Sequence, residues 1–193
     1  MYFIKRKNLT KLNNRSAAVV LGFVLASSAA SAADPAPAPG SQGQGTVTFK
    51  GSVIDSPCSI TSETANQTVD MGQISNSALK KAGKSTPRPF SIKLENCDVS
   101  SLTNKTVTAT FTGTASKAQP TNLALVGQVS GAALVITNGD GASVSLGSPT
   151  QPTSVHNGNN TLSYAAYLQG DSEKVAIVPG DFSSVANFTL AYQ

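Results

Sequence analysis

Residues 187–193 read NFTLAYQ, and their side chains alternate in character: Phe188, Leu190 and Tyr192 are apolar, with small or polar residues between them. Earlier positions on the same face are Ala186, Ser184 and Phe182. An alternation of period two predicts a β-strand with one buried face. The end residues of a domain usually fray unless other parts of the structure hold them. The pattern therefore predicts a terminal strand that is packed against a partner.

The first 32 residues have the organisation of an export signal. Cationic side chains occur at Lys5, Arg6, Lys7, Lys11 and Arg15. The apolar run 17–30 follows and ends in small residues, with Ala30 and Ala32 placed for cleavage before Ala33. A membrane-spanning helix needs ~20 apolar residues, and this run is shorter. We therefore expect residues 1–32 to be a signal peptide that is removed on export.

Removing that segment changes the charge of the chain. The full sequence has 14 Lys and Arg against 10 Asp and Glu, a formal charge of +4. All ten acids lie at Asp34 or later, whereas only nine of the bases do. The remaining chain is therefore close to −1, and the basic character offers no support for nucleic-acid binding.

The remaining chain, of about 160 residues, is long enough for one domain with a full core. Residues 34–45, DPAPAPGSQGQG, have the composition of a linker. After them, Val47, Phe49, Gly51 and Val53 lie on one face of an extended segment. Further strand candidates are 67–74, 89–97, 105–113, 123–127, 132–138, 160–169, 174–178 and the end of the chain. Turn signals occur at 83–89, 138–143 and 156–160. Short strands at this spacing predict an all-β sandwich, with a short helical turn possible within 74–85.

The two cysteines are Cys58 and Cys97. An even number of cysteines in an exported chain predicts a disulfide. Its loop of about 40 residues would stabilise the fold by roughly 4 kcal/mol in the chain-entropy model. Two free buried thiols are the alternative.

The sequence has no recognisable catalytic or metal-binding constellation. His156 is the single histidine and lies in a turn-like stretch, so it cannot form a multi-histidine metal site. NGDG at 138–141 lacks the acid spacing of a calcium loop and predicts a hairpin turn instead. We therefore expect no enzyme activity, no metal and no cofactor.

Three stretches carry a resemblance to a known family: GQGTVTFKGSVIDSPCSI (43–60), QTVDMGQIS (67–75) and FSIKLENCDVS (90–100). Together with the positions of Cys58 and Cys97, they resemble the pilin subunits of chaperone–usher fimbriae, with the nearest likeness to the major rod subunits of P and type 1 pili. The end of the chain agrees, because Gly180 is fourteenth from the end and Tyr192 is penultimate, as in the chaperone-recognition pattern of that family.

The resemblance implies an incomplete immunoglobulin-like β-sandwich that lacks its last strand. A periplasmic chaperone would first fill the resulting groove, and at the outer-membrane usher the N-terminal extension of the next subunit would replace it. This is strand addition used as a polymer bond, and it implies a fimbria on the bacterial surface that can contact a host. The implied parts are a signal peptide (1–32), an extension with the donor strand (33–51) and a pilin domain (52–193).

The resemblance also implies two sets of functional residues. The donor side chains would be Gly43, Gly45, Val47 and Phe49. The strand that borders the groove and meets the chaperone would present Gly180, Phe182, Ala186, Phe188, Leu190 and Tyr192.

Several alternatives remain open from the sequence. Residues 46–53 could be an ordinary first strand of their own sandwich, and residues from Ser52 onward are expected to begin that strand in either case. The chain could be a minor tip, adaptor or terminator pilin instead of the rod subunit. A self-contained secreted immunoglobulin-like binding domain is the alternative from a different class.

Overall fold

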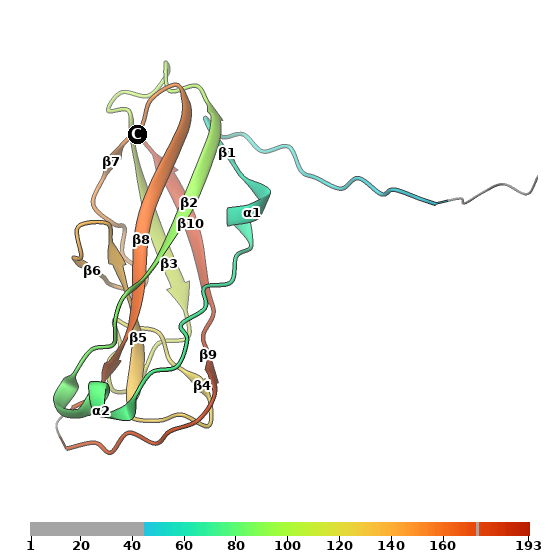
Figure 1. Ribbon diagram of the computed structural model, residues 1–193. Helices are drawn as coiled ribbons and strands as arrows, with labels where there is room; N and C mark the ends of the chain where they lie inside the picture. The colour runs from blue at the N-terminus through green and yellow to red at the C-terminus, as the bar shows by residue number, and fades with distance from the viewer. Residues whose placement is uncertain (1–44, 173) are drawn as a thin grey trace, which may run out of the picture. The chain divides into compact units, whose positions relative to one another are not determined.

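The computed structural model describes residues 45–172 and 174–193, and the body of the fold comprises Gly51–Gln193 (Figure 1). The expected signal peptide, the first part of the expected extension and Gly43 lie outside the described residues. Residues 45–50 form no helix or strand, and the side chains of Val47 and Phe49 are 75% and 90% exposed. Within the described ranges, no helix has the length and apolar character that a membrane span requires.

The regular structure of the body is mainly β, as the sequence predicts, and its strands pair antiparallel. The larger sheet has the order β1 (Ser59–Ile60), β2 (Arg88–Cys97), β8 (Gly158–Gly170), β5 (Ala132–Asn138), β6 (Ser143–Val144). The second sheet has the order β10 (Ala186–Tyr192), β3 (Thr106–Gly113), β7 (Thr153–Ser154). A small pair joins β4 (Val126–Gly127) to β9 (Phe182–Ser183). The helical segments are α1 (Ser62–Ala65), α2 (Asn76–Leu79) and the 3₁₀ turn η1 (Lys80–Ala82).

The two main sheets bury an aromatic cluster between them. Phe111 of β3 packs edge-on against Tyr164 of β8, with ring centroids 5.1 Å apart, and against Phe90 of β2 at 6.3 Å. The ring centroid of Phe188 on β10 lies 6.4 Å from that of Phe111. Phe111 is only 2% exposed. One side chain of the second sheet therefore contacts aromatic rings from both sheets.

The predicted disulfide is present. Cys58 and Cys97 are bonded across a sequence separation of 39 residues, and both are buried. The bond ties the residue just before β1 to the last residue of β2. It therefore fixes the entry of the chain into the larger sheet.

The structure corrects four details of the strand prediction. Residues 67–74 form no strand, and within 174–178 only Val178 makes an isolated bridge, to Ser130. The prediction for 123–127 shrinks to β4, and the first strand begins at Ser59 instead of near Ser52. In each case the extended pattern is present, but a strand also needs a hydrogen-bonded neighbour. The hairpin turn at 138–143 and the helical turn within 74–85 are confirmed.

Candidate functional site: a groove beside strand β10

Among the described residues, strand β10 is hydrogen-bonded to a neighbouring strand on one side only. It pairs with β3 over its whole length without a bulge. Thr106 and Gln193 exchange two backbone hydrogen bonds, of 3.0 and 2.9 Å. Antiparallel partners alternate between hydrogen-bonded and non-hydrogen-bonded pairs. The backbone N–H and C=O groups at positions 186, 188, 190 and 192 therefore point away from β3, and no backbone hydrogen bond joins them to another described segment.

The side chains at those same positions point inward but are only half-buried. They pack against the main core as Ala186, Phe188, Leu190 and Tyr192. Three of the partners across the ladder on β3, opposite Tyr192, Leu190 and Phe188, are in contrast fully buried: Val107 is 1% exposed, Ala109 0% and Phe111 2%. Gly113, opposite Ala186 at the end of the ladder, is exposed. In a closed sandwich, facing positions of paired strands are covered alike. The difference shows that cover is missing along the outer edge of β10.

The other wall of the site is the stretch 68–74, which we call the lip segment. It is neither helix nor strand, and among the described residues no backbone–backbone hydrogen bond joins it to another segment. Its side chains nevertheless alternate: Val69 and Met71 are half-buried, whereas Thr68 and Asp70 are exposed. The lip segment therefore has the side-chain pattern of a strand without the ladder that would make it one.

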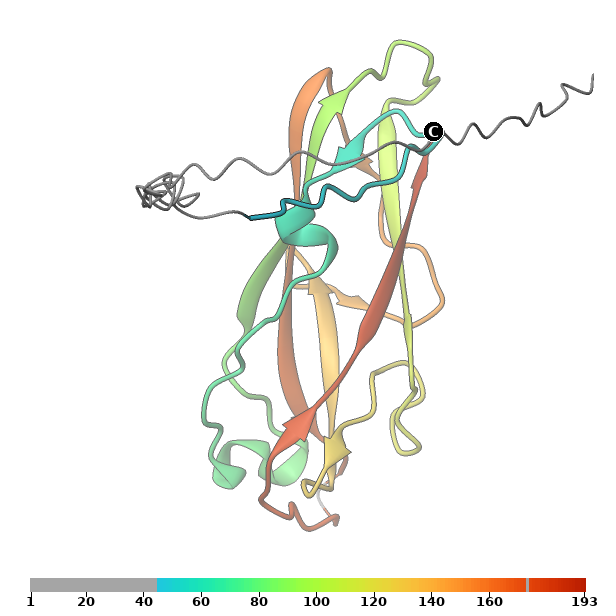
Figure 2. The same ribbon diagram turned by 90° about the vertical axis from the view of Figure 1, so that its right-hand side faces the viewer.

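A groove of about 1650 Å³ lies between the lip segment and β10. Figure 2 shows the stretch between α1 and α2, which contains the lip segment, descending on the left and β10 crossing the middle of the domain, with strands of the larger sheet behind them. The base of the groove is apolar and includes Phe90, Phe111, Leu123, Leu134, Ile136 and Leu168. The sandwich is thus open along one edge, down to its own core.

The structure brings together part of the predicted set of edge residues. Gly180, Phe182, Ala186 and Phe188 line the groove, whereas Leu190 and Tyr192 lie further along β10 and pack against the core. The predicted donor positions Gly45, Val47 and Phe49 lie in the exposed segment 45–50.

Sequence reasoning missed the lip segment and the base of the groove as parts of the site. The apolar alternation of Val69 and Met71 is the available signal, but the same alternation also predicts an ordinary strand. The base residues carry no separate signal, because each is also a normal core residue of its own strand.

Gly180 is held in a close approach that leaves no room for a side chain. A Cβ atom there would lie 2.6 Å from Cβ of Gln128 and 3.0 Å from the backbone nitrogen of Val129. We expect Gly180→Ala to lower the free energy of unfolding by about 1–3 kcal/mol, because backbone must shift to relieve the contact. Gly147→Ala is a poor control because its φ is positive, whereas Gly51→Ala also replaces a glycine, at an ordinary φ and with no atom beyond its chain neighbours within 4 Å of the added Cβ. Urea unfolding of the three proteins measures the difference, and a Gly180→Ala protein as stable as the parent would contradict the prediction.

Comparison with known proteins gives a consistent result. The fimbrial protein family matches residues 47–193. The chain is 55% identical to the Fimbria A protein of Serratia marcescens over 95% of this chain and 99% of that one. It is 47% identical to the Major MR/P fimbria protein of Proteus mirabilis, with the same two shares covered.

A similar subunit occurs in a solved structure of a chaperone–usher pilus, which addresses the molecular basis of rod uncoiling. It superposes with a TM-score of 0.70 at 38% identity, covering 79% of this chain and 98% of that subunit. The family match spans most of the chain, and the fold, the disulfide and the open edge agree with the resemblance found in the sequence. The chain therefore belongs to the fimbrial protein family, whose members are the structural pilins of chaperone–usher fimbriae on the bacterial surface.

Proposed function

We propose that this chain is the major structural subunit of a fimbria and has no catalytic role. Subunits join when residues 43–51 of one copy occupy the groove of the next as an added strand. The joint is heterologous and does not close on itself, so identical subunits form an open helical filament. The names of the relatives, which describe major fimbrial proteins, support the assignment to the abundant subunit.

One observation carries this proposal: the mismatch in burial across the β3–β10 ladder. Phe188, Leu190 and Tyr192 of β10 are half-buried opposite partners on β3 that are almost completely buried. The outward backbone groups of β10 and the unpaired lip segment face the same groove. An added strand supplies both missing features, because its side chains cover the core while its backbone completes a ladder.

The segment that precedes the fold has the chemistry of such a strand. Val47 and Phe49 are two residues apart, so an extended backbone places both side chains on one face. Both are almost fully exposed in the single chain, and burying them contributes roughly 1.5–3 kcal/mol each. Gly45, also on that face, lets backbone approach a shallow part of the groove because it has no Cβ. Gly43 would be the next position on that face.

The same proposal assigns the remaining parts of the pathway. Residues 1–32 direct export and are removed, residues 33–51 are the extension, and residues 52–193 are the pilin domain. In the periplasm a chaperone covers the groove, contacting the edge formed by Gly180, Phe182 and β10. An outer-membrane usher then exchanges the chaperone for the next subunit. Contact with a host surface would occur through the assembled fimbria.

The proposal predicts that fimbriae are lost when the donor face is made charged. Val47→Asp with Phe49→Asp would place two carboxylates against an apolar groove, where their desolvation is unfavourable. We expect electron microscopy to show no fimbriae, with the subunit still detectable in the periplasm. Thr46→Asp with Thr48→Asp is the matched control, because it adds the same two charges on the opposite face of the segment. Normal fimbriae from the double variant would refute the proposal.

A further inference from the structure

The free edge of β2 is completed by side chains instead of a strand. The neighbouring strand β1 pairs with β2 over only two residues, Ser59 with Glu95 and Ile60 with Leu94. The backbone N–H of Thr61 then donates to the carbonyl oxygen of Lys93 at 3.0 Å. After this residue the chain turns away through α1. The next part of the β2 edge must therefore find its partners elsewhere.

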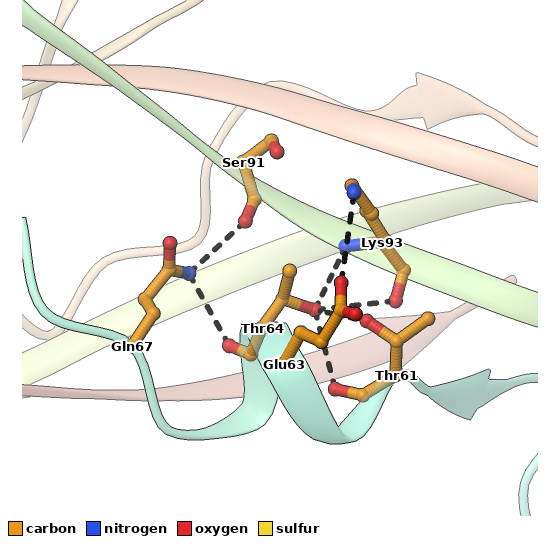
Figure 3. A network of polar contacts seen from close by, with 6 residues as sticks. All are labelled: Thr61, Glu63, Thr64, Gln67, Ser91 and Lys93. Carbon is orange, nitrogen blue, oxygen red and sulfur yellow. Dashed lines mark hydrogen bonds and ion pairs between the residues drawn. The ribbon is translucent and has the colours of Figure 1, made fainter.

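Thr64 provides the first of these partners. Its hydroxyl oxygen accepts the backbone N–H of Lys93 at 3.1 Å and lies 2.8 Å from the hydroxyl of Thr61 (Figure 3). The Thr64 residue is 7% exposed. A buried hydroxyl is unfavourable unless it is hydrogen-bonded, so the position of α1 against β2 depends on these contacts.

Gln67 provides the second partner one turn later. Its side-chain Nε2 donates to the backbone carbonyl of Ser91 at 3.0 Å and to that of Thr64 at 3.2 Å. It therefore bonds to β2 two residues before Lys93 and also closes the end of α1. Gln67 is the last residue joined to β2 before the lip segment begins.

The lip segment is consequently hydrogen-bonded to β2 only through the residues just before it, and along its length it is held by packing of half-buried side chains such as Ile74. Thr64 and Gln67 fix the end near α1, and the other end leads into α2, whose Leu79 is 3% exposed. Between these points no backbone–backbone hydrogen bond joins the described residues 68–74 to another segment. The hydrogen bonds that place the lip segment relative to β2 thus come from the side chains of Thr64 and Gln67.

We propose that Thr64 and Gln67 are positioning residues for strand exchange. They hold the lip segment at the place where an incoming strand can pair with β10 and with the lip segment at the same time. This inference rests on the proposed function, because it concerns the same groove. Both residues also line the groove, so the test must separate positioning of the lip segment from direct contact with the added strand, and hydrogen exchange of residues 68–74 does so.

The role predicts an effect mainly on how long an added strand stays bound. When the lip segment is already held in place, less conformational entropy is lost as the added strand pairs with it. Affinity differences between variants of one interface are usually differences in dissociation rate. Removing the hydrogen bonds of Thr64 or Gln67 should therefore speed release of a bound strand more than it slows binding.

The experiment uses the full chain carrying Val47→Asp and Phe49→Asp, so that it accepts a strand but does not donate one. A fluorescent peptide of residues 42–52 is bound, and its release is followed after adding unlabelled peptide. Thr64→Val keeps the shape of the side chain but removes the hydroxyl, and Gln67→Glu removes the N–H donor. We expect each to speed release about tenfold, the effect of losing one hydrogen bond of ordinary strength.

Two further variants separate positioning from general stability. Thr64→Ser keeps the hydroxyl and should restore parental release. Lys93→Gln is the matched control within the network: it removes the exposed ion pair with Glu63, at 3.9 Å, but keeps the backbone groups that Thr64 binds. Exposed ion pairs contribute little to stability. The rate of peptide release from Lys93→Gln should therefore stay within about twofold of the parental rate. Gln67 is exposed, so Gln67→Glu keeps the test open even where Thr64→Val does not fold.

Hydrogen exchange of the peptide complex supplies the second measurement. We expect the amides of residues 68–74 to exchange faster in Thr64→Val and Gln67→Glu, while those of β3 and β8 stay protected. Equal release and equal exchange in all variants would overturn the positioning role. A parent protein that does not bind the peptide would instead overturn the proposed function, so the two failures are distinguishable.

Discussion

A chain lacking residues 1–52 should melt at a much higher temperature in the presence of a peptide of residues 42–52 than alone. The peptide would cover the open base of the groove and complete the edge of β10. Each kcal/mol gained raises the melting temperature by about 3–5 °C for a domain of this size. Burial of Val47 and Phe49 alone corresponds to several kcal/mol, and the half-buried side chains of β10 add to it. We therefore expect a rise of about 10 °C or more, measured by circular dichroism with peptide in excess.

Two altered peptides serve as controls for this result. A peptide with Asp at positions 47 and 49 should give almost no rise, because its apolar face is lost. A peptide with Asp at position 48 should act like the parent, since that side chain would point out of the groove. A truncated chain that is stable, monomeric and indifferent to all three peptides would be a self-contained domain, and the polymer proposal would then be wrong.

Phe111→Ala should produce the second large effect. The Phe111 ring is almost completely buried and contacts aromatic rings from both sheets. Truncating a buried Phe usually lowers the free energy of unfolding by about 3–5 kcal/mol, through lost burial and the cavity left behind. Because Phe111 also lines the groove, the loss should persist when the donor peptide is bound. Denaturant unfolding with and without peptide measures both values.

Thr112→Ala is the control for this substitution. It lies next in β3 but is exposed, so its effect should stay within about 0.5 kcal/mol. A loss below about 1 kcal/mol for Phe111→Ala would show that the neighbouring rings of Phe90, Tyr164 and Phe188 collapse into the space. In that case the base of the groove adapts to the loss of a ring.

The central strands were predictable because their own sequences carry the signal. The prediction of 132–138 matches β5, and those of 89–97, 105–113 and 160–169 match β2, β3 and β8 within a few residues. In each case alternating or continuous apolar side chains lie between clear turn residues. The hairpin at 138–143 followed for the same reason, since Asn-Gly-Asp-Gly favours a tight turn.

The groove was harder to predict because it depends on a partner that is absent from the single chain. The pattern around Val69 and Met71 is the same whether or not a neighbour is present, so it could not show that the ladder would be missing. The short strands β6 and β7, of two residues each, have too little sequence for a periodic signal. The anchoring contacts of Thr64 and Gln67 depend on tertiary geometry, and nothing in their spacing indicates them.

The position of the disulfide has a mechanical consequence for a filament built in this way. Tension along the filament would pull on the extension of each subunit and reach the fold through the few residues that precede Cys58. The first strand beyond that point, β1, pairs with β2 over only two residues and could be peeled from the sheet edge by a modest force. The bond to Cys97 lies ahead of β1 on this path and passes the load directly to β2, a ten-residue strand paired along most of its length with β8. Each subunit thus transmits traction through a covalent link into its most extensively bonded strands.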